Sequence, residues 1–303
     1  MMLAPPAFAP ADQLRRETLG VVRVMLTYGW RHRRLPQLTD PQRFTEFVQQ
    51  RKLENRDPFQ HVLMDKLAAK RMAADALGAE WAIPTLWQAE ELPAQDPAPG
   101  PSIVKARHGC NQYHPIWRPN PDAWEKLRPR TQRWMASHYG FWLDEWAYKD
   151  VPRGLFAEPL LGDGRTLPVD YKIYVFGGRA THVQVHLGRG TRHRWMLHDR
   201  DWQPLVPTDD MPPRPISLPD MLAAAETLAA GAEFLRVDFF EIAGRPLFGE
   251  FCLYPGSGLD PFAADWIDLE LGALWREARA LRRPDPPRSS IGRTRPRDPP
   301  RAW

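Results

Sequence analysis

The sequence has only two cysteines, Cys110 and Cys252, and no apolar run approaches the roughly 20 residues that a membrane-spanning helix requires. So few cysteines in 303 residues argue against a disulfide-stabilised secreted domain and favour a reducing compartment. The N-terminal stretch lacks the basic residues that open a signal peptide, and prolines interrupt its apolar residues. We therefore expect a cytoplasmic protein, with the inner face of the membrane as an alternative location.

The net positive charge of the chain lies mainly in residues 282–303. The whole chain carries +4, but residues 282–303 hold seven arginines against two aspartates, which leaves the remainder close to neutral. A near-neutral body offers no basic groove to follow a phosphate backbone, so no nucleic-acid partner is expected. The arginine- and proline-rich segment is predicted to be disordered. No His and Cys spacing resembles a zinc site, and no internal repeat is present.

The hydrophobic pattern predicts helices early in the chain and strands in its second half, which is an α+β plan. Helices are expected over residues 12–28, from 41 onward, and over 65–77, 121–137, 219–230 and 265–281. Strands are expected over residues 83–87, 102–105, 155–161, 169–176, 180–187 and 194–198, before a hairpin within 234–258. This organisation divides the chain into an N-terminal helical region (1–60), a first lobe (61–153), a second lobe (154–281) and a tail (282–303).

The first predicted helix is both apolar and basic. Its apolar residues lie near one stripe, and arginines flank that stripe at positions 15, 16, 23, 31, 33 and 34. We favour a helix that packs on the body and directs its arginines to solvent. The alternative is peripheral contact with an anionic membrane surface.

The most informative stretch is a predicted β-hairpin that holds two carboxylates face to face. Two apolar runs flank the turn Ala243-Gly244-Arg245, and a three-residue loop would pair Asp238 with Glu250. Like charges at such a distance repel, so the pair needs a cation. Phe240 and Phe248 are expected to shield the same face. Oxygen ligands suit Mg²⁺, so we predict a metal site; the alternative is a surface hairpin with solvated charges.

Three lysines could hold an anion. Lys66 opens a helix next to Asp65, and Lys105 ends a strand before a turn that contains His108 and Gly109. Each could contact a phosphate, although an ordinary edge lysine is the alternative for Lys105. Lys172 shares a predicted sheet face with Asp170, and the two could simply neutralise each other.

A strand proline and a basic loop complete the list of candidates. Pro159 follows Glu158, and a proline within a strand suggests a sheet edge, where free backbone groups could pair with a purine. The loop between two later strands is a weaker candidate for gripping an anionic substrate, with a solvated turn as its alternative. Its residues are Arg189, Arg192, His193 and Arg194.

In these positions the chain resembles the ATP-grasp superfamily and, within it, the TupA-like ATP-grasp family of surface-polysaccharide biosynthesis. The resemblance runs from Leu38 to Gly272. It is carried by seven segments in order: LTDPQRFTEFVQQRKL, MDKLAAKRMAADALG, SIVKARHG, FAEPLL, DYKIYVFGG, RVDFFEIAG and FGEFCLYPGSG.

The resemblance implies an ATP held between two α+β lobes, with Mg²⁺ bridging its phosphates. It assigns Lys66, Lys105 and Lys172 to the nucleotide phosphates, and Glu158 and Leu160 to the adenine and ribose. It further assigns Asp238 and Glu250 to the metal, and Arg236 to the transferred phosphoryl group. Lys172 and Arg236 are the expected catalytic residues.

Three positions depart from the superfamily pattern. Cys252 stands where an asparagine usually follows the second metal carboxylate. The turn after Lys105 has a single glycine, and His186 replaces an acidic residue that often stands at this position.

The predicted function is an ATP- and Mg²⁺-dependent carboxylate–amine ligase that forms an acyl phosphate. Its expected substrates are an amine and a carboxylate of a small molecule or cell-envelope glycan. The alternatives are a sugar kinase of the same fold, and a non-catalytic nucleotide-binding protein.

Overall fold

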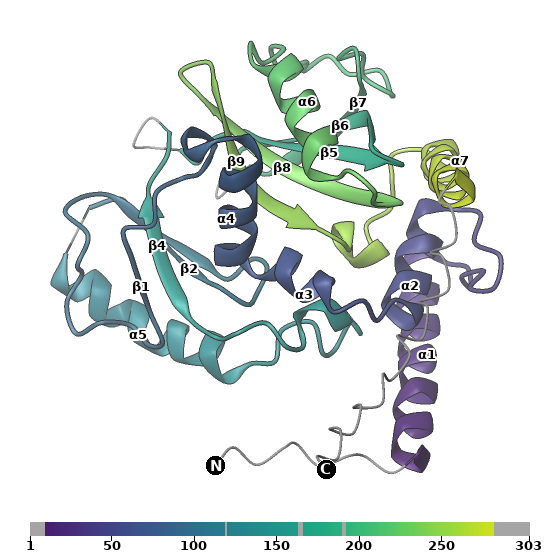
Figure 1. The fold of residues 1–303 in the computed structure, drawn as a ribbon, viewed down its shortest axis with the longest axis horizontal. Coiled ribbons are helices and arrows are strands. Elements are labelled where there is room, and N and C mark those ends of the chain that lie inside the picture. Colours follow the sequence, from purple (N-terminus) through teal and green to yellow (C-terminus); the bar gives the residue numbers. More distant parts are fainter. Residues whose placement is uncertain (1–9, 119, 163–165, 190–191, 282–303) are drawn as a thin grey trace, which may run out of the picture.

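A computed structural model describes residues 10–118, 120–162, 166–189 and 192–281, with the side chains of residues 10–17 not described. Figure 1 shows two sheets, with α5 beside the first, α6 beside the second and α4 between the two in this view. The helices are α1 (Pro10–His32), α2 (Phe44–Glu54), α3 (Phe59–Met64), α4 (Lys66–Leu77), α5 (Pro121–Ala136), α6 (Leu218–Leu228) and α7 (Asp265–Leu281). Short 3₁₀ turns lie at Ala79–Trp81, Trp146–Tyr148 and Pro255–Gly258. The predicted tail lies outside the described residues.

The strands form two antiparallel sheets. The first sheet has the order β1 (Trp87–Ala89), β4 (Leu155–Pro159), β2 (Ser102–Ala106), β3 (Tyr113–Ile116). The second has the order β7 (Arg194–Asp199), β6 (Arg179–Leu187), β5 (Asp170–Phe176), β8 (Phe234–Ile242), β9 (Arg245–Cys252). The α+β prediction is thus confirmed.

Sheet order corrects one prediction. β4 lies inside the first sheet, between β1 and β2, so the prediction of an edge strand around Pro159 is wrong. The predicted lobe boundary between residues 153 and 154 stays a prediction; β4, which it assigns to the second lobe, pairs with β1 and β2 of the first sheet. β1 has only three residues and β3 four, which is too short for an alternating pattern to reveal.

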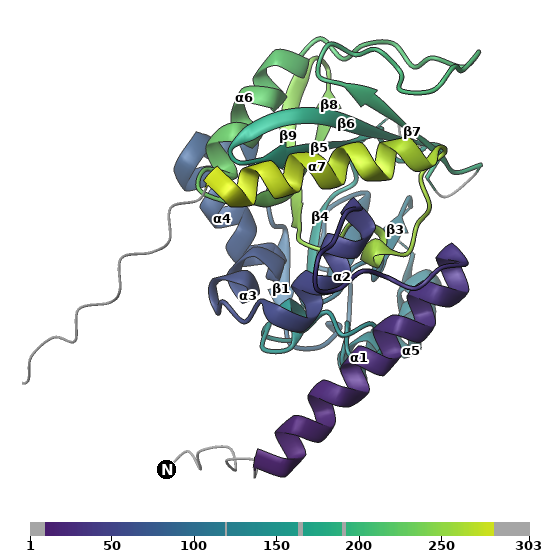
Figure 2. The ribbon, with the colours of Figure 1, turned by 90° about the vertical axis from the view of Figure 1, so that its right-hand side faces the viewer.

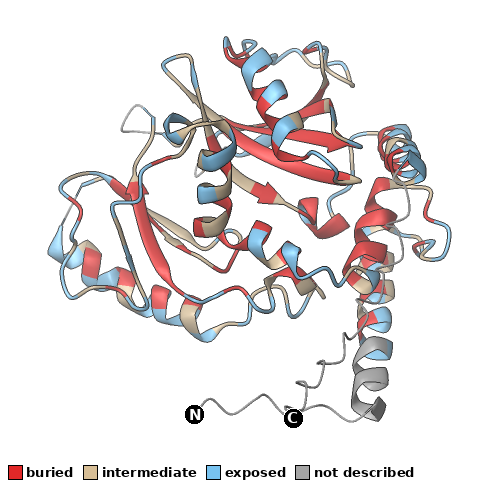
Figure 3. Cartoon of the chain, viewed as in Figure 1, coloured by how far each residue is buried: buried red, intermediate tan, exposed pale blue. Residues whose placement is uncertain are grey.

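Alternation along β5 separates an apolar face from the face that carries Asp170 and Lys172. All seven residues of β5 are buried. Ile173 and Val175 belong to the main core, to which α6 contributes Leu218, Met221 and Leu222. On the other face, Tyr174 and Phe176 near the end of β5 pack against α2 and α7, and Trp275 of α7 is fully buried. Figure 3 shows the central strands of the second sheet mostly in the colour of buried residues.

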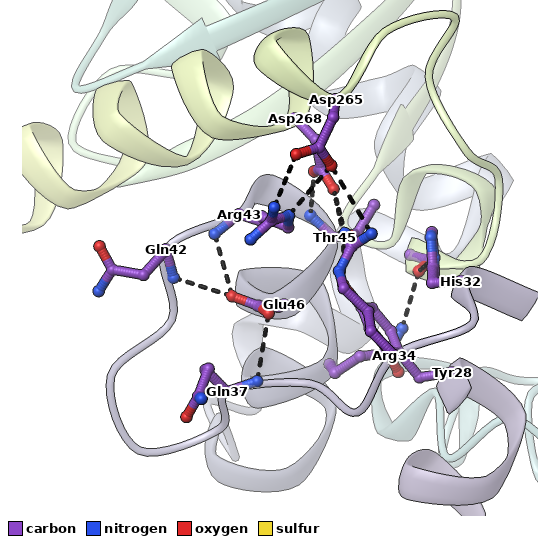
Figure 4. Close-up of polar contacts among 12 residues, drawn as sticks. Tyr28, His32, Arg34, Gln37, Gln42, Arg43, Thr45, Glu46, Asp265 and Asp268 are labelled. Atoms are coloured by element: carbon purple, nitrogen blue, oxygen red, sulfur yellow. Dashed lines mark hydrogen bonds and ion pairs between the residues drawn. The ribbon is translucent and has the colours of Figure 1, made fainter.

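A polar network joins α1 and α2 to α7. Asp268 of α7 accepts hydrogen bonds from the Thr45 backbone N–H at 2.9 Å and from its hydroxyl at 2.7 Å. Tyr28 of α1 lies 2.9 Å from the same hydroxyl, and Arg34 contacts Asp268 at 3.1 Å (Figure 4). Because Tyr28 and Asp268 are buried, this network fixes the inner side of α1 to the body.

Candidate functional site

The predicted carboxylate pair exists, and a bulge creates it. Asp238 lies directly opposite Glu250, as predicted. The connecting turn has two residues, Ala243 and Gly244, both with positive φ, instead of the predicted three. The register shifts between Asp238 and Phe239, which leaves Gly249 as an extra residue in β9 and restores the predicted pairing.

The bulge also corrects the prediction about the phenylalanines. Phe248 pairs with Phe239, and both are fully buried in the core on the other face of the sheet. Only Phe240 shares the face of the carboxylates. A residue other than glycine at position 249 would place its Cβ 3.0 Å from the Asp238 carbonyl oxygen, so the bulge is tightly packed.

A cavity of about 950 Å³, part of it open to solvent, lies between the two sheets and α4. Its walls bring together most of the predicted nucleotide and metal residues. From the predicted set, the lining includes Lys66, Lys105, Glu158, Leu160, Asp238, Glu250 and Arg189. Apolar residues line the rest: Ile83, Ile103, Phe156, Leu161 and Leu167.

Each lysine of the cavity is paired with a carboxylate. The Lys66 ammonium lies 2.7 Å from Glu250, and that of Lys105 lies 2.5 Å from Glu158. Lys70, one turn after Lys66 on α4, also pairs with Glu158. Burial alone would raise the pKa of Glu250, but the charges of Lys66 and Lys172 outweigh it and hold that pKa well below its usual range.

Asp238 is the centre of a buried ion network. Arg236 binds it with two N–H groups, at 2.7 and 2.8 Å, and Lys172 pairs with its second oxygen. Lys172 also lies 2.7 Å from Asp170, which accepts a further bond from Arg189 at 2.6 Å. Burial disfavours the charged lysine, but Asp170 and Asp238 outweigh this and raise the pKa of Lys172.

Asp170 is a cavity residue whose role the sequence did not assign. Its side chain is buried at the cavity wall, and among the residues that the structure describes its Oδ1 has no hydrogen-bond partner. Lys70 was missed as well. The available signals were the shared sheet face of Asp170 and Lys172, and the four-residue spacing of Lys66 and Lys70 on one helix.

Several predicted residues lie elsewhere. His108 is buried, contacts the Trp134 carbonyl at 3.0 Å, and does not line the cavity; nor does Gly109. The turn after Lys105 instead contributes Cys110, Asn111, Gln112 and Tyr113. Leu160 lines the cavity, but its backbone N–H donates to the Pro101 carbonyl at 3.1 Å instead of being free.

The predicted basic loop is divided. Arg189 belongs to the cavity, whereas Arg194 pairs with Asp210 at the surface and Arg192 is exposed. His193 lies in a second cavity of about 510 Å³, which Arg236 also lines. There His193 lies 2.9 Å from His186, and burial lowers the pKa of His186 to about 2, so His186 is neutral. Gln184, Trp195 and Thr45 complete much of this wall.

Residues 46–276, well over half of the chain, match the family model described as TupA-like ATPgrasp. The chain belongs to the TupA-like ATP-grasp family. Its α+β architecture is accordingly an ATP-grasp-like fold. ATP-grasp proteins typically use ATP and Mg²⁺.

Solved structures give more distant likenesses. A D-alanine–D-alanine ligase from Bacillus anthracis, complexed with ATP, is 15% identical with a TM-score of 0.44, over 73% of this chain and 66% of that one. The ATP-grasp ligase PsnB is 12% identical with a TM-score of 0.39, over 74% and 60%. The D-cycloserine synthetase DcsG is 18% identical with a TM-score of 0.43, over 83% and 81%. This chain thus spans less than two thirds of the first two structures. No curated protein matches it.

The residues present suit a magnesium ion. The described residues contain no cluster of three or more His, Cys, Asp or Glu side chains that could hold a metal. Mg²⁺, however, is usually bound by one or two carboxylates together with substrate phosphates, which Asp238 and Glu250 could provide. Burial raises the pKa of Cys252 to about 12, so its thiol stays protonated.

Proposed function

We propose that this protein is an ATP- and Mg²⁺-dependent carboxylate–amine ligase acting on a cell-surface polysaccharide or its precursor. The observation that supports it best is the cavity in which four cationic side chains meet the paired carboxylates Asp238 and Glu250. Apolar walls continue this charged region toward Glu158 and Leu160. One cavity therefore has a slot for a flat base and a cage for a triphosphate.

In the proposed reaction, a substrate carboxylate takes the terminal phosphoryl group of ATP and becomes an acyl phosphate. An amine then attacks the acyl carbon, the bond to phosphate breaks, and an amide and inorganic phosphate result. Activation is needed because a carboxylate is a poor electrophile. Catalysis then consists mainly of positioning and of stabilising charge on the phosphoryl oxygens.

The chain's own residues have distinct tasks in this reaction. Lys66, Lys105 and Lys172 offset phosphate charge, and Arg236 orients the transferred group while it holds Asp238 in place. Asp238 and Glu250 would hold Mg²⁺, which draws charge from the phosphates. Arg236 binds Asp238, which lines the first cavity, and itself forms part of the wall of the second. We infer from this link that the second cavity receives the acceptor.

The test is turnover of ATP with Mg²⁺ in the presence of uronic acids and amino acids. We expect ADP, free phosphate and an amide product, and Asp238→Asn or Glu250→Gln should lower the rate by at least ~100-fold. Glu277→Gln, an exposed carboxylate of α7, is the matched control and should leave the rate unchanged. Phosphate retained on the sugar would instead indicate a kinase. Wild-type turnover in both site variants would overturn the proposed metal role.

A further inference from the structure

The outer side of α1 carries an exposed apolar stripe. Leu19, Val22, Leu26 and Trp30 are 48%, 47%, 67% and 73% exposed. Their spacings of three, four and four residues place them on one face of the helix. Scattered exposed apolar residues are normal, but four consecutive members of one helical stripe form a surface.

The stripe lies on the outer side of α1, because the opposite side of the helix packs against the body. Val24 and Tyr28 are buried, and Tyr28 belongs to the polar network that joins α1 to α2 and α7. Figures 1 and 2 show α1 at the edge of the molecule, with its N-terminal half extending away from the sheets. The stripe is therefore presented to the surroundings by a helix that is fixed in place.

A neighbouring loop enlarges this surface. Phe141 and Trp142 are each 71% exposed. Arg23 ties their loop to α1, because its Nε donates to Asp144 at 2.9 Å and its guanidinium lies 5.7 Å from the Phe141 ring. Aromatic side chains of this kind, with an apolar body, are typical of the boundary between water and lipid.

The charge of this region identifies what the surface fits. Residues 10–34 contain two acidic residues, Asp12 and Glu17, against six arginines. Arg23, Arg31 and Arg34 pair with acidic side chains of the body, whereas Arg33 is exposed and adds to the positive charge of this end of the helix. A second copy of the chain would bring a like-charged helix against this one, which costs free energy. An anionic lipid surface provides the opposite charge together with an apolar layer for the stripe.

We propose that the outer face of α1, with Phe141 and Trp142, binds the surface of a bilayer that contains anionic lipids. The stripe and the two aromatic residues enter the boundary between headgroups and acyl chains, and the arginines contact the headgroups. The helix lies on the membrane. No helix in the described part of the chain has the length and hydrophobicity to cross a bilayer.

The test is co-sedimentation of the full-length protein with phosphatidylcholine vesicles, with and without phosphatidylglycerol. We expect binding to the anionic vesicles. Leu26→Glu and Trp30→Glu should each reduce the bound-to-free ratio by about tenfold, since each places a charge in the apolar layer. Ile216→Glu is the matched control, because Ile216 is 82% exposed but lies far along the chain, before α6. It should bind like the unchanged protein.

The variants separate this surface from other sources of binding. All of them keep the arginine-rich tail, so equal binding by Leu26→Glu, Trp30→Glu and the unchanged protein would overturn the proposal. Failure of the unchanged protein to sediment with anionic vesicles would do the same. A dimer in light scattering that Leu26→Glu dissociates, without vesicle binding, would assign the stripe to a second copy. Unchanged far-ultraviolet circular dichroism establishes that each variant is folded.

Discussion

Removal of the Lys172 ammonium should destabilise the fold more than the loss of any exposed lysine. The side chains of Lys172, Asp170 and Asp238 are 6%, 2% and 2% exposed, so water screens their interactions little. Lys172→Met keeps the length of the side chain and deletes its charge. Two buried carboxylates then lose a shared partner, and loss of one member of a buried ion pair typically costs about 3–5 kcal/mol.

The remaining partners place the expected value near the lower end of that range. Arg236 still binds Asp238 with two N–H groups, and Arg189 still binds Asp170. Neither carboxylate is left without a cation. We therefore expect the free energy of unfolding to fall by about 3 kcal/mol. With a dependence on urea of about 3 kcal/mol per molar, the unfolding midpoint would fall by about 1 M.

Equilibrium unfolding in urea, followed by tryptophan fluorescence and by circular dichroism, measures this change. Coincident transitions are required before a single free energy is assigned. Lys149→Met removes an exposed lysine and should change stability by less than about 0.5 kcal/mol. Adding Asp170→Asn to Lys172→Met should recover part of the loss, because one of the two buried carboxylates that lost a cationic partner is then absent. If Lys172→Met unfolds at the unchanged midpoint, the buried ion network contributes nothing to stability and our reasoning is wrong.

Two further predictions concern the bulge and a buried lysine. Gly249→Val should lower the free energy of unfolding by about 1–3 kcal/mol, since the valine side chain meets the Asp238 backbone. It should also slow ADP formation, because it displaces Glu250. An unchanged rate would contradict this. Lys52, which donates to the Ser257 carbonyl and hydroxyl at 2.7 Å each, has its pKa lowered by burial to about 8. Between pH 8 and the ordinary pKa near 10.5, the unfolded chain therefore binds more protons than the folded one. The free energy of unfolding should rise with pH across this window, relative to that of Lys52→Met. If urea unfolding shows the same difference between the two proteins at every pH in the window, the prediction is wrong.

Local sequence pattern predicted the helices and the pairing of Asp238 with Glu250. That pairing was predicted correctly, but from a turn of the wrong length. The predicted loop was one residue too long, and the bulge at Gly249 adds one residue back. Apolar alternation did not reveal the bulge, because Leu247 and Phe248 are both apolar and either could be assigned to the core face. That is why Phe248 was assigned to the wrong face.

Sheet order and the second cavity could not be predicted for a different reason. β4 pairs with strands that precede it by some 50 residues or more, so its position between β1 and β2 depends on contacts distant in sequence. The second cavity likewise combines Thr45 of α2, His186 of β6 and Arg236 of β8. No local pattern connects three such separated positions. The family resemblance supplied the roles of Lys66 and Lys105, which single residues did not establish.

The pairing of cavity lysines with carboxylates has a consequence for how the proposed ligand would bind. A phosphate that takes Lys66 from Glu250 leaves a partly buried carboxylate without its cation, and this costs free energy. ATP alone would therefore gain little from exchanging one anion for another around the same lysine. A divalent cation that arrives with the nucleotide restores the balance, because Glu250 and Asp238 then have a new partner. We therefore expect the ion pairs of the cavity to make nucleotide binding depend on Mg²⁺ and to keep the carboxylates charged and in position until the ion arrives.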